Sequence, residues 1–284
     1  MIKYDPMSKI IEKVFFSENV AKFVLEVPDI ARSRKAGHFV IIRLDENGER
    51  IPLTIADGDS EKGTITLVVQ KVGVTSARLL KMSVGDEILD VVGPLGHATH
   101  IDNYGTVLCA GGGVGVAPLM PIVKALKEAG NRIITVLAGR TKELIIMEDE
   151  MRKFSDELIV MTDDGSYGKK GLVTSGMEEM IQKEKIHKAV VIGPAIMMKF
   201  GSLTTKKYNI PTEVSLNTIM VDGTGMCGAC RVSIGGKTKF VCVDGPEFDA
   251  FQVNWDEMMM RMGAYKMQEH EAYEKYLSTL ETKV

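Results

Sequence analysis

Three cysteines stand close together in the last quarter of this 284-residue chain. Cys227, Cys230 and Cys242 have the spacing C-x2-C-x11-C. Iron–sulfur loops that begin C-x4-C-x2-C bind their cluster through four thiolates. Counting back across the x4 gap from Cys227 reaches Asp222 instead of a cysteine. The pattern predicts an iron–sulfur site for electron transfer, with a carboxylate where one thiolate is expected.

Glycines surround the predicted ligands, at Gly223, Gly225 and Gly228. A glycine backbone can approach the sulfides of a cluster closely because it has no Cβ. A zinc site is the alternative, but zinc sites usually add a second CxxC pair or histidines, and no histidine lies between Cys227 and Cys242. The sequence therefore favours [2Fe–2S] over zinc. Asp222 is also compatible with a simple turn cap, and Cys109 with core packing.

A glycine-rich stretch, AGGGVGVAP, lies at residues 110–118, where a short apolar strand is expected to pass into a helix. Glycines at such a turn let the pyrophosphate of a dinucleotide reach backbone N–H groups at a helix N-terminus. The stretch differs from G-x-G-x-x-G, so alone it is also compatible with a tight strand–helix connection. Pro118 suits the first position of the helix.

Further segments are suited to binding flavin or phosphate. Arg50 and Thr54 stand on an expected strand, where an arginine can reach a pyrophosphate and a hydroxyl can bond the edge of a flavin. Residues 73–76 (GVTS) offer N–H groups and hydroxyls to a phosphate. Residues 162–166 (TDDGS) and 193–194 (GP) end predicted parallel strands, at the edge where such sheets bind ligands. Each segment alone is also compatible with an ordinary strand or loop.

The elements that must position these residues fall into two patterns. Up to about residue 100, short β-branched runs at 9–16, 20–27, 38–44, 64–72 and 87–92 are separated by turns such as 46–48 and 57–59. Their close spacing predicts a small antiparallel barrel. From residue 106, strands at 106–110, 133–138, 158–162 and 189–192 alternate with helices, which predicts a parallel sheet with helices on its faces.

Capping signals mark three of the expected helices. The helix at 117–129 ends before Gly130, a typical C-terminal glycine. The next begins with the capping-box pair Ser175 and Glu178. The tail beyond residue 250 is predicted to be helical, with Asn254 as N-cap and Glu257 three residues later.

Composition limits the class of protein. A net charge of −3 argues against a nucleic-acid partner, which usually requires a basic face. No apolar run is long enough for a membrane span, and the N-terminus lacks the apolar region of a signal peptide. We therefore expect a cytoplasmic protein, in which clustered cysteines indicate metal binding instead of disulfides.

In their order, these motifs resemble the ferredoxin-reductase superfamily over about residues 8–250. Within it the chain is similar to the electron-transfer subunits of dihydroorotate dehydrogenase B and to the small subunits of NADH-dependent reduced ferredoxin:NADP oxidoreductases. The dihydroorotate relatives have cysteine at the position of Asp222, so that aspartate favours the second group, as does the segment 243–255. The resemblance implies an FAD-binding barrel at 1–100, an NAD-binding α/β domain at 101–208, a [2Fe–2S] loop at 209–250 and a helical tail at 251–284.

The resemblance also implies roles for individual residues. FAD is expected to be bound by Arg50, Pro52, Leu53, Thr54, Gln70, Gly73, Thr75 and Ser76. NAD(H) is expected to be bound by Gly113, Val114, Gly115, Arg140, Asp164, Gly193 and Pro194. The cluster is expected to be bound by Asp222, Cys227, Cys230 and Cys242. No catalytic acid, base or nucleophile is expected, because a flavin links two-electron nicotinamide chemistry to a one-electron cluster.

The function implied is that of an electron-transfer subunit that exchanges hydride with NAD(H). Its partner would be a larger flavin and [4Fe–4S] subunit, and the heterodimer would perform electron bifurcation between NADH, NADP(H) and ferredoxin. Alternatives are an electron-transfer subunit of dihydroorotate dehydrogenase B or of a sulfide or polysulfide reductase. A further alternative is an iron–sulfur carrier that binds no nicotinamide. The choice between NAD and NADP stays open, since Arg140 is also suited to contact a 2′-phosphate.

Overall fold

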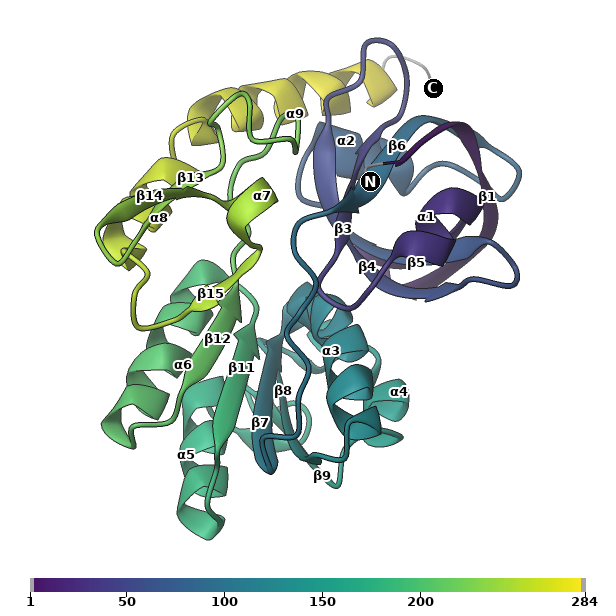
Figure 1. The fold of residues 1–284 in the computed structure, drawn as a ribbon. Helices are drawn as coiled ribbons and strands as arrows, with labels where there is room; N and C mark the ends of the chain where they lie inside the picture. Colours follow the sequence, from purple (N-terminus) through teal and green to yellow (C-terminus); the bar gives the residue numbers. More distant parts are fainter. Residues whose placement is uncertain (1–2, 282–284) are drawn as a thin grey trace.

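A closed antiparallel barrel forms the N-terminal part of the computed structural model, which describes residues 3–281 (Figure 1). Its strands are β1 (Lys3–Ser17), β2 (Val20–Glu26), β3 (Phe39–Arg43), β4 (Ile51–Asp59), β5 (Thr64–Gln70) and β6 (Glu87–Leu95). They pair in the order β1-β2-β5-β4-β3-β6. The predicted barrel is therefore confirmed. The turn predicted at 57–59 is wrong, because those residues are the end of β4 and the chain turns after them.

Two short helices in the barrel region were not expected from the sequence. They are α1 (Pro28–Ser33) and α2 (Val74–Leu79), which begins directly after Gly73. Residues 73–76, predicted as a turn suited to phosphate, are thus the N-cap and the first turn of α2. Each helix has only six residues, too few for a clear helical period, which explains why the pattern missed them.

The side chains of strand β3 alternate between the inside and the outside of the barrel. Val40 and Ile42 pack in the barrel interior. Phe39 and Ile41 alternate with them and therefore point outward. There they join Leu95, which pairs with Phe39 across the ladder, in a core shared with the C-terminal half of the chain. This outer face is the surface through which the barrel contacts the rest of the protein.

A seven-stranded sheet forms the second part, in the order β10-β9-β8-β7-β11-β12-β15. Its strands are β7 (Thr106–Gly112), β8 (Arg132–Gly139), β9 (Glu157–Thr162), β10 (Lys169–Lys170), β11 (Lys188–Ile192), β12 (Thr212–Ser215) and β15 (Glu247–Asp249). All pairs are parallel except β12 with β15. The predicted parallel sheet is confirmed, and it takes its last two strands from the segment 209–250.

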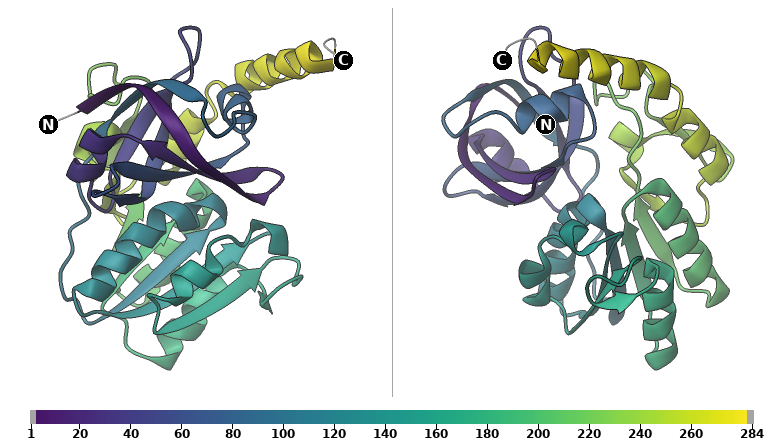
Figure 2. Two further views of the ribbon diagram at one scale, coloured as in Figure 1. Left: turned by 90° about the vertical axis from the view of Figure 1, so that its right-hand side faces the viewer. Right: turned by 180° about the vertical axis from the view of Figure 1, so that it is seen from behind.

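Helices cover both faces of this sheet (Figures 1 and 2). On one side lie α3 (Val116–Glu128) and α4 (Glu148–Arg152), and on the other α5 (Val173–Lys183) and α6 (Ala195–Lys207). Short 3-10 turns, η1 (Gly113–Gly115) and η2 (Lys142–Leu144), follow β7 and β8. The arrangement leaves the C-terminal ends of the parallel strands facing the barrel (Figure 1).

The helix ends agree only in part with the capping signals. Gly130 follows α3 with a φ of +86°, as expected for a residue that ends a helix. Pro118 is the third residue of α3, so its predicted place at the first position is wrong. Ser175 is not an N-cap either, because α5 already begins at Val173 without a side-chain cap. Asn254 is confirmed as a cap, since its Oδ1 accepts a hydrogen bond of 3.2 Å from the backbone N–H of Glu257.

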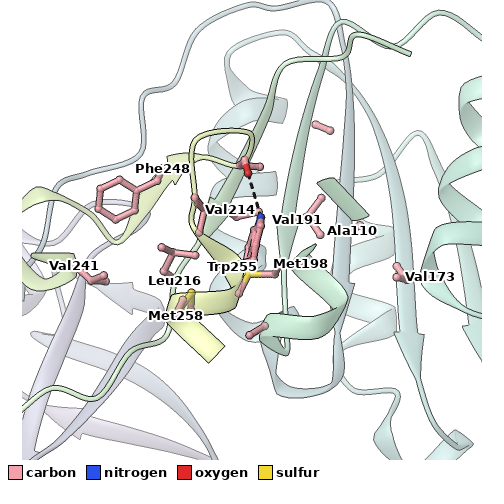
Figure 3. Packing of buried hydrophobic residues seen from close by; sticks show 14 of the residues in the cluster. Ala110, Val173, Val191, Met198, Val214, Leu216, Val241, Phe248, Trp255 and Met258 are labelled. Atoms are coloured by element: carbon pink, nitrogen blue, oxygen red, sulfur yellow. Dashed lines mark hydrogen bonds between the residues drawn. The ribbon is translucent and has the colours of Figure 1, made fainter. Parts of the chain in front are cut away.

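The cysteine segment is a hairpin followed by a helical tail. The hairpin strands are β13 (Arg231–Ile234) and β14 (Lys237–Phe240), and α7 (Val241–Asp244) follows them. The tail contains α8 (Trp255–Met262) and α9 (Lys266–Glu281). Figure 3 shows Trp255 and Met258 of α8 packed near Leu216 and Met198, with the Trp255 indole N–H donating to the Ala250 carbonyl at 3.3 Å. The tail is therefore part of the main core.

Helix α9 spans from the cysteine segment back to the barrel (Figure 2). At its far end it contacts α2, where the Lys81 ammonium lies 5.4 Å from the ring centroid of Tyr276. Within residues 3–281, no helix combines the length and apolar character that crossing a bilayer requires.

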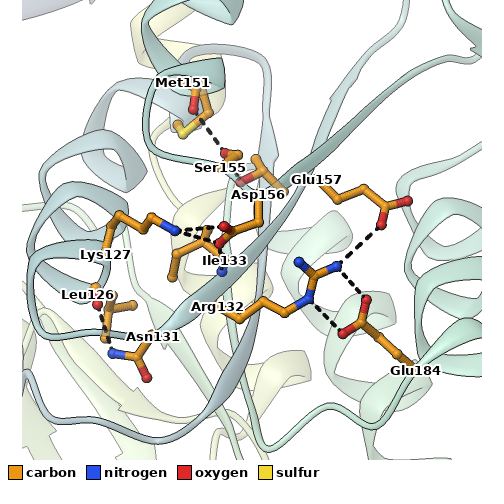
Figure 4. Close-up of polar contacts among 11 residues, drawn as sticks. Leu126, Lys127, Asn131, Arg132, Ile133, Met151, Ser155, Asp156, Glu157 and Glu184 are labelled. Carbon is orange, nitrogen blue, oxygen red and sulfur yellow. Dashed lines mark hydrogen bonds and ion pairs between the residues drawn. The ribbon is translucent and has the colours of Figure 1, made fainter.

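Ion pairs gather at the N-terminal ends of β8 and β9, away from the barrel (Figure 4). Arg132 binds both carboxylate oxygens of Glu184, at 2.8 and 2.9 Å. Lys127 contacts Asp156 at 2.7 Å. Exposed pairs of this kind contribute up to about 1 kcal/mol each. The charged network therefore supports the end of the sheet opposite to the site described below.

The connection between barrel and sheet is bonded to β15. The Thr99 hydroxyl donates a hydrogen bond of 2.6 Å to the carboxyl of Glu247, and the His97 N–H donates to the Gly245 carbonyl at 2.6 Å. Burial raises the pKa of Glu247 to about 7, and the negative charge of Glu213 adds to the shift while Lys188 opposes it. A carboxyl therefore stands at the junction of barrel, sheet and cysteine segment.

We expect Glu247 to make stability fall as pH rises. The folded protein holds this proton up to about pH 7, whereas the unfolded chain loses it near 4.5, so unfolding releases a proton between these values. The contribution is present below about 4.5 and is lost by about 7, amounting to at most about 3 kcal/mol. Denaturant titrations at several pH values give the free energy of unfolding at each pH. Between pH 4.5 and 7 this free energy should fall less steeply with pH in Glu247→Gln than in the wild type. Glu179→Gln, at an exposed ion pair with Lys169, is the control. Equal slopes in wild type and Glu247→Gln would contradict the prediction.

Candidate functional site

A cavity of about 1360 Å³ lies between the outer face of the barrel and the C-terminal ends of the parallel strands. It brings together most of the residues predicted to bind FAD and NAD(H). The barrel contributes Pro52, Leu53, Thr54 and Gln70. The sheet contributes Gly113, Val114, Gly115, Arg140, Gly193 and Pro194. Segments far apart in the sequence thus line one space, as a flavin placed against a nicotinamide requires.

The barrel wall of the cavity is built by the pairing of β3 with β4. Thr54 stands opposite Phe39, and Pro52 stands opposite Ile41. Side chains that are paired in this way point to the same side of the sheet. Phe39 also lines the cavity, and only 3% of its surface is exposed. The wall is therefore a mostly apolar surface with one hydroxyl, which suits the ring system of a flavin.

The predicted phosphate-binding residues lie beside this wall but do not line the cavity. The Ser76 hydroxyl accepts hydrogen bonds from the N–H groups of Val72 and Gly73, at 2.9 and 3.0 Å. The Thr75 hydroxyl donates to Glu49 at 3.4 Å. A Cβ at Gly73 would meet no atom within 4 Å, so this turn faces open space. Arg50 is exposed just before β4 and also lies outside the cavity lining.

The glycine-rich stretch forms the turn between β7 and α3. Gly113 has a φ of +54°, and a Cβ there would enter open space. Gly115 has the opposite environment, because its Cβ would lie 2.7 Å from the Cα of Gly193 and from the carbonyl oxygen of Ile192. The two glycines therefore serve different purposes. Gly113 keeps the cavity open, and Gly115 lets the turn contact the end of β11.

The structure distinguishes the two aspartates at the end of β9. Asp163 lines the cavity beside Arg140. Asp164 does not; its carboxylate accepts hydrogen bonds from the N–H and hydroxyl of Ser166, at 2.9 and 2.7 Å, and these bonds lower its pKa. The sequence predicts Asp164 at the NAD site, whereas the cavity lining includes its neighbour Asp163. Both aspartates lie in a bend that follows β9.

The hairpin explains the long gap between the last two cysteines. Cys230 precedes β13 and Cys242 follows β14, so the antiparallel pairing returns the chain to its starting point. Their Sγ atoms lie 3.2 Å apart, both residues are buried, and neither forms a disulfide. Burial, together with the neighbouring thiol, raises the pKa of Cys242 to about 12. Cys227 lies at the surface.

Asp222 caps the loop that contains Cys227. Its carboxylate accepts hydrogen bonds from the N–H of Thr224 at 2.8 Å and from the N–H of Cys227 at 2.9 Å. The first of these bonds is the main cause of a lowered pKa. The turn-cap interpretation thus describes this geometry, and the carboxylate is held directly beside a cysteine. Asp222 and Cys227 form one pair of potential ligands, and the two buried cysteines form another.

The backbone around these pairs is held by glycines and arginines. Gly223, Gly225 and Gly228 all have positive φ, between +66° and +84°. Arg231 donates to the carbonyl of Gly228 at 3.2 Å, and Arg261 of α8 donates to the carbonyl of Ala229 at 3.3 Å. The tail therefore reaches back to the loop between the first two cysteines.

The donor set fits a two-iron cluster better than a single metal ion. Within residues 3–281, no three His, Cys, Asp or Glu side chains converge on one point suited to a metal. A cluster with two irons needs two protein ligands at each iron. Two pairs, one of thiols and one of carboxylate and thiol, satisfy that requirement, and free thiols are the ligands that iron–sulfur clusters use.

Comparison with known proteins agrees with this division of the chain. Residues 7–100 match the oxidoreductase FAD-binding domain, and residues 110–202 match the oxidoreductase NAD-binding domain. Residues 217–254 match the iron–sulfur cluster binding domain of dihydroorotate dehydrogenase B. The FAD, NAD and iron–sulfur components expected from the sequence are thus confirmed as binding domains.

Whole-chain relatives extend the comparison. The chain is 52% identical to a dihydroorotate dehydrogenase B (NAD(+)) electron transfer subunit homolog from Thermotoga maritima, over 96% of each chain. It is 32% identical to the dihydroorotate dehydrogenase B (NAD(+)) electron transfer subunit of Desulforamulus reducens, over 88% of this chain and 98% of that one. A solved structure of NADH-dependent reduced ferredoxin-NADP oxidoreductase, described in terms of flavin-based electron bifurcation, matches with 50% identity and a TM-score of 0.91. That match covers 96% of this chain and 99% of the other.

Proposed function

Because the chain belongs to the dihydroorotate dehydrogenase B electron-transfer-subunit family, we propose that it carries electrons between NADH and a partner subunit of an electron-bifurcating reductase. The chain is an oxidoreductase subunit with FAD-, NAD- and iron–sulfur-binding domains. The single observation that carries the finer proposal is the 50% identity, over nearly the whole chain, to the bifurcating oxidoreductase structure. The cytoplasmic location expected from the sequence is part of this proposal.

The residues of the cavity support hydride exchange with a nicotinamide. FAD, when bound, exchanges electron pairs with nicotinamide and single electrons with an iron–sulfur cluster. Phe39 and Pro52 give the barrel wall its apolar surface, and Thr54 offers a hydroxyl there. Gly113 keeps the opposite wall open. The chain's own contribution is thus to orient two planar groups in one cavity, with no acid or base from the protein.

The cysteine loop supports transfer of single electrons to another protein. We propose Asp222, Cys227, Cys230 and Cys242 as the cluster ligands. Cys227 is exposed, and its neighbour Met226 has 88% of its surface exposed. An exposed end of this kind lets a partner approach the cluster closely. An electron-transfer subunit implies a partner with the catalytic site, and we propose a larger flavin and [4Fe–4S] subunit that uses NADP(H) and ferredoxin.

Anaerobic purification with flavin, iron and sulfide analysis tests the proposal. We expect NADH to bleach the flavin absorption of the isolated chain and then to reduce the cluster. A chain that contains flavin but shows no bleaching by NADH would refute the proposal. Coexpression with candidate partners tests the assignment to a bifurcating reductase, because copurification of a subunit with CxxC clusters supports bifurcation.

A dihydroorotate dehydrogenase partner is the second candidate. It is favoured by the match of residues 217–254 to the cluster domain of that enzyme. Dihydroorotate-dependent reduction of the cluster in a reconstituted complex would support it and would exclude the bifurcating assignment. The alternative of an iron–sulfur carrier without nicotinamide binding does not fit the NAD-binding domain at residues 110–202.

Asp163 is expected to select NADH over NADPH. A carboxylate at the end of a strand accepts hydrogen bonds from a ribose diol and repels a 2′-phosphate. In Asp163→Asn, the ratio of kcat/KM for NADH to that for NADPH should fall roughly tenfold, the equivalent of losing one hydrogen bond to a charged group. Asp164→Asn makes the same chemical change outside the cavity and should leave the ratio unchanged. Equal ratios in the two variants would contradict the assignment.

A further inference from the structure

A glycine stands at the contact between the cysteine loop and the barrel. Gly223 follows Asp222, is buried, and has a φ of +75°. A Cβ at this position would lie 2.7 Å from the Cδ1 atoms of both Ile41 and Leu95. Real Cβ atoms do not approach other atoms so closely, so a side chain here must push the ends of Ile41 and Leu95 further into the core or move the loop away from the barrel.

The barrel residues at this contact have little freedom to move. Ile41 and Leu95 have 1% and 2% of their surface exposed, and they share a core with Cys230 and Cys242. Ile41 belongs to β3 and Leu95 ends β6. Overpacking of a filled core is destabilising. The loop is held mainly by hydrogen bonds and not by a packed interior, so it is the part expected to shift.

The same outer face of the barrel carries the proposed flavin wall. Pro52 stands opposite Ile41, and Thr54 stands opposite Phe39, in the ladder of β3 with β4. Neighbouring strands lie about 4.8 Å apart. The contact of Gly223 with Ile41 is thus one strand away from the residues that line the cavity. Gly223 thus contacts the same face of the barrel that carries the proposed flavin wall.

We propose that Gly223 is a positioning residue that sets the separation between the flavin site and the cluster site. The inference rests on the function proposed above. Electron tunnelling falls off exponentially with separation, so a small outward shift of the loop slows transfer without removing either group. No hydrogen or covalent bond is required of Gly223; its contribution is the absence of a side chain at the point of closest approach.

The test introduces a side chain that tolerates the local backbone. Asparagine adopts positive φ more readily than other non-glycine residues, so Gly223→Asn adds bulk with little backbone strain. Gly236→Asn is the matched control: Gly236 has a φ of +76° in the β13–β14 turn of the same segment, and a Cβ there would meet no atom within 4 Å. Both variants are compared as holoproteins with equal flavin and iron content.

Stopped-flow reduction by NADH separates the two electron-transfer steps. We expect flavin bleaching in Gly223→Asn at the wild-type rate, and cluster reduction slowed several-fold relative to Gly236→Asn. Magnetic coupling between the flavin radical and the reduced cluster, measured by EPR, should weaken in the same variant. Adding Leu95→Ala makes room on the barrel side. The double variant should regain part of the rate of cluster reduction and part of the magnetic coupling.

The outcomes are distinguishable. Wild-type protein that shows no NADH-driven bleaching would refute the proposed function. Normal cluster reduction and unchanged magnetic coupling in Gly223→Asn would refute the positioning role alone. If Gly223→Asn fails to retain its cluster, Gly223→Ala against Gly236→Ala repeats the comparison with a single added methyl group. Equal rates in that pair would also overturn the inference.

Discussion

Cys230→Ala removes the iron–sulfur cluster and leaves NADH-dependent flavin bleaching intact. Cys230 and Cys242 are buried with their sulfurs 3.2 Å apart, so the loss of one thiolate leaves an iron without half of its protein ligands. Iron and sulfide analysis should show essentially complete loss of the cluster, with the EPR signal of the reduced cluster absent.

Cys109→Ala is the control for this variant. Cys109 is also fully buried, and burial raises the pKa of its thiol to about 12, but it lies in β7 far along the chain from the cysteine loop. The control should retain iron and sulfide at the wild-type level. Retention of the cluster by Cys230→Ala, or its loss from Cys109→Ala, would show that the ligands are assigned wrongly. In the same assay, Asp222→Ala should weaken retention and Asp222→Cys should preserve it.

Gly115→Ala slows flavin bleaching by NADH on the order of 100-fold, the size of effect that a misplacement of about 1 Å produces in a catalytic site. The φ of Gly115 is −62°, so alanine meets no backbone strain. Its Cβ would instead lie 2.7 Å from two backbone atoms at the end of β11, which cannot rotate away. The turn and Gly193 must separate, and the nicotinamide side of the cavity changes shape.

Gly176→Ala controls for a general loss of stability. Gly176 lies inside α5, and a Cβ there would crowd the side chains of Met161 and Val136 at 3.0 Å beneath the sheet. Thermal unfolding should show both variants destabilised, by about 1–3 kcal/mol as overpacking predicts. Stopped-flow bleaching should be slowed in Gly115→Ala alone. A normal rate in that variant would refute the role of the Gly115–Gly193 contact.

Elements whose residue types follow a simple periodic pattern were predicted from the local sequence. Alternation and β-branched residues identified the barrel strands, and short apolar runs identified the parallel strands, because each signal lies within a few residues. The boundaries were less accurate. Ser175 has the residue type of a cap but lies in the first turn of α5, since Val173 packs into the core and extends the helix backward. Burial of an apolar residue outweighed a capping preference.

The site was predictable as a set of segments but not as a geometry. The motifs named Gly113 and Thr54, the resemblance added Arg140, and the cavity brings the three together. Which of Asp163 and Asp164 lines the cavity depends on the bend that follows β9, and no local sequence pattern specifies the shape of that bend. The approach of Cys230 to Cys242 depended on the β13–β14 hairpin, whose strands have only four residues each and no clear pattern.

Strand β15 determines the order in which this molecule can be completed during synthesis. It covers the edge of β12, yet it follows the last cysteine in the chain. A nascent chain therefore exposes the unpaired N–H and C=O groups of β12 until residues beyond Cys242 have emerged. The edge of the sheet and the cluster loop close within the same few residues. A chain cut directly after Cys242 would thus keep β12 but lack β15, and the edge of β12 would have no cover.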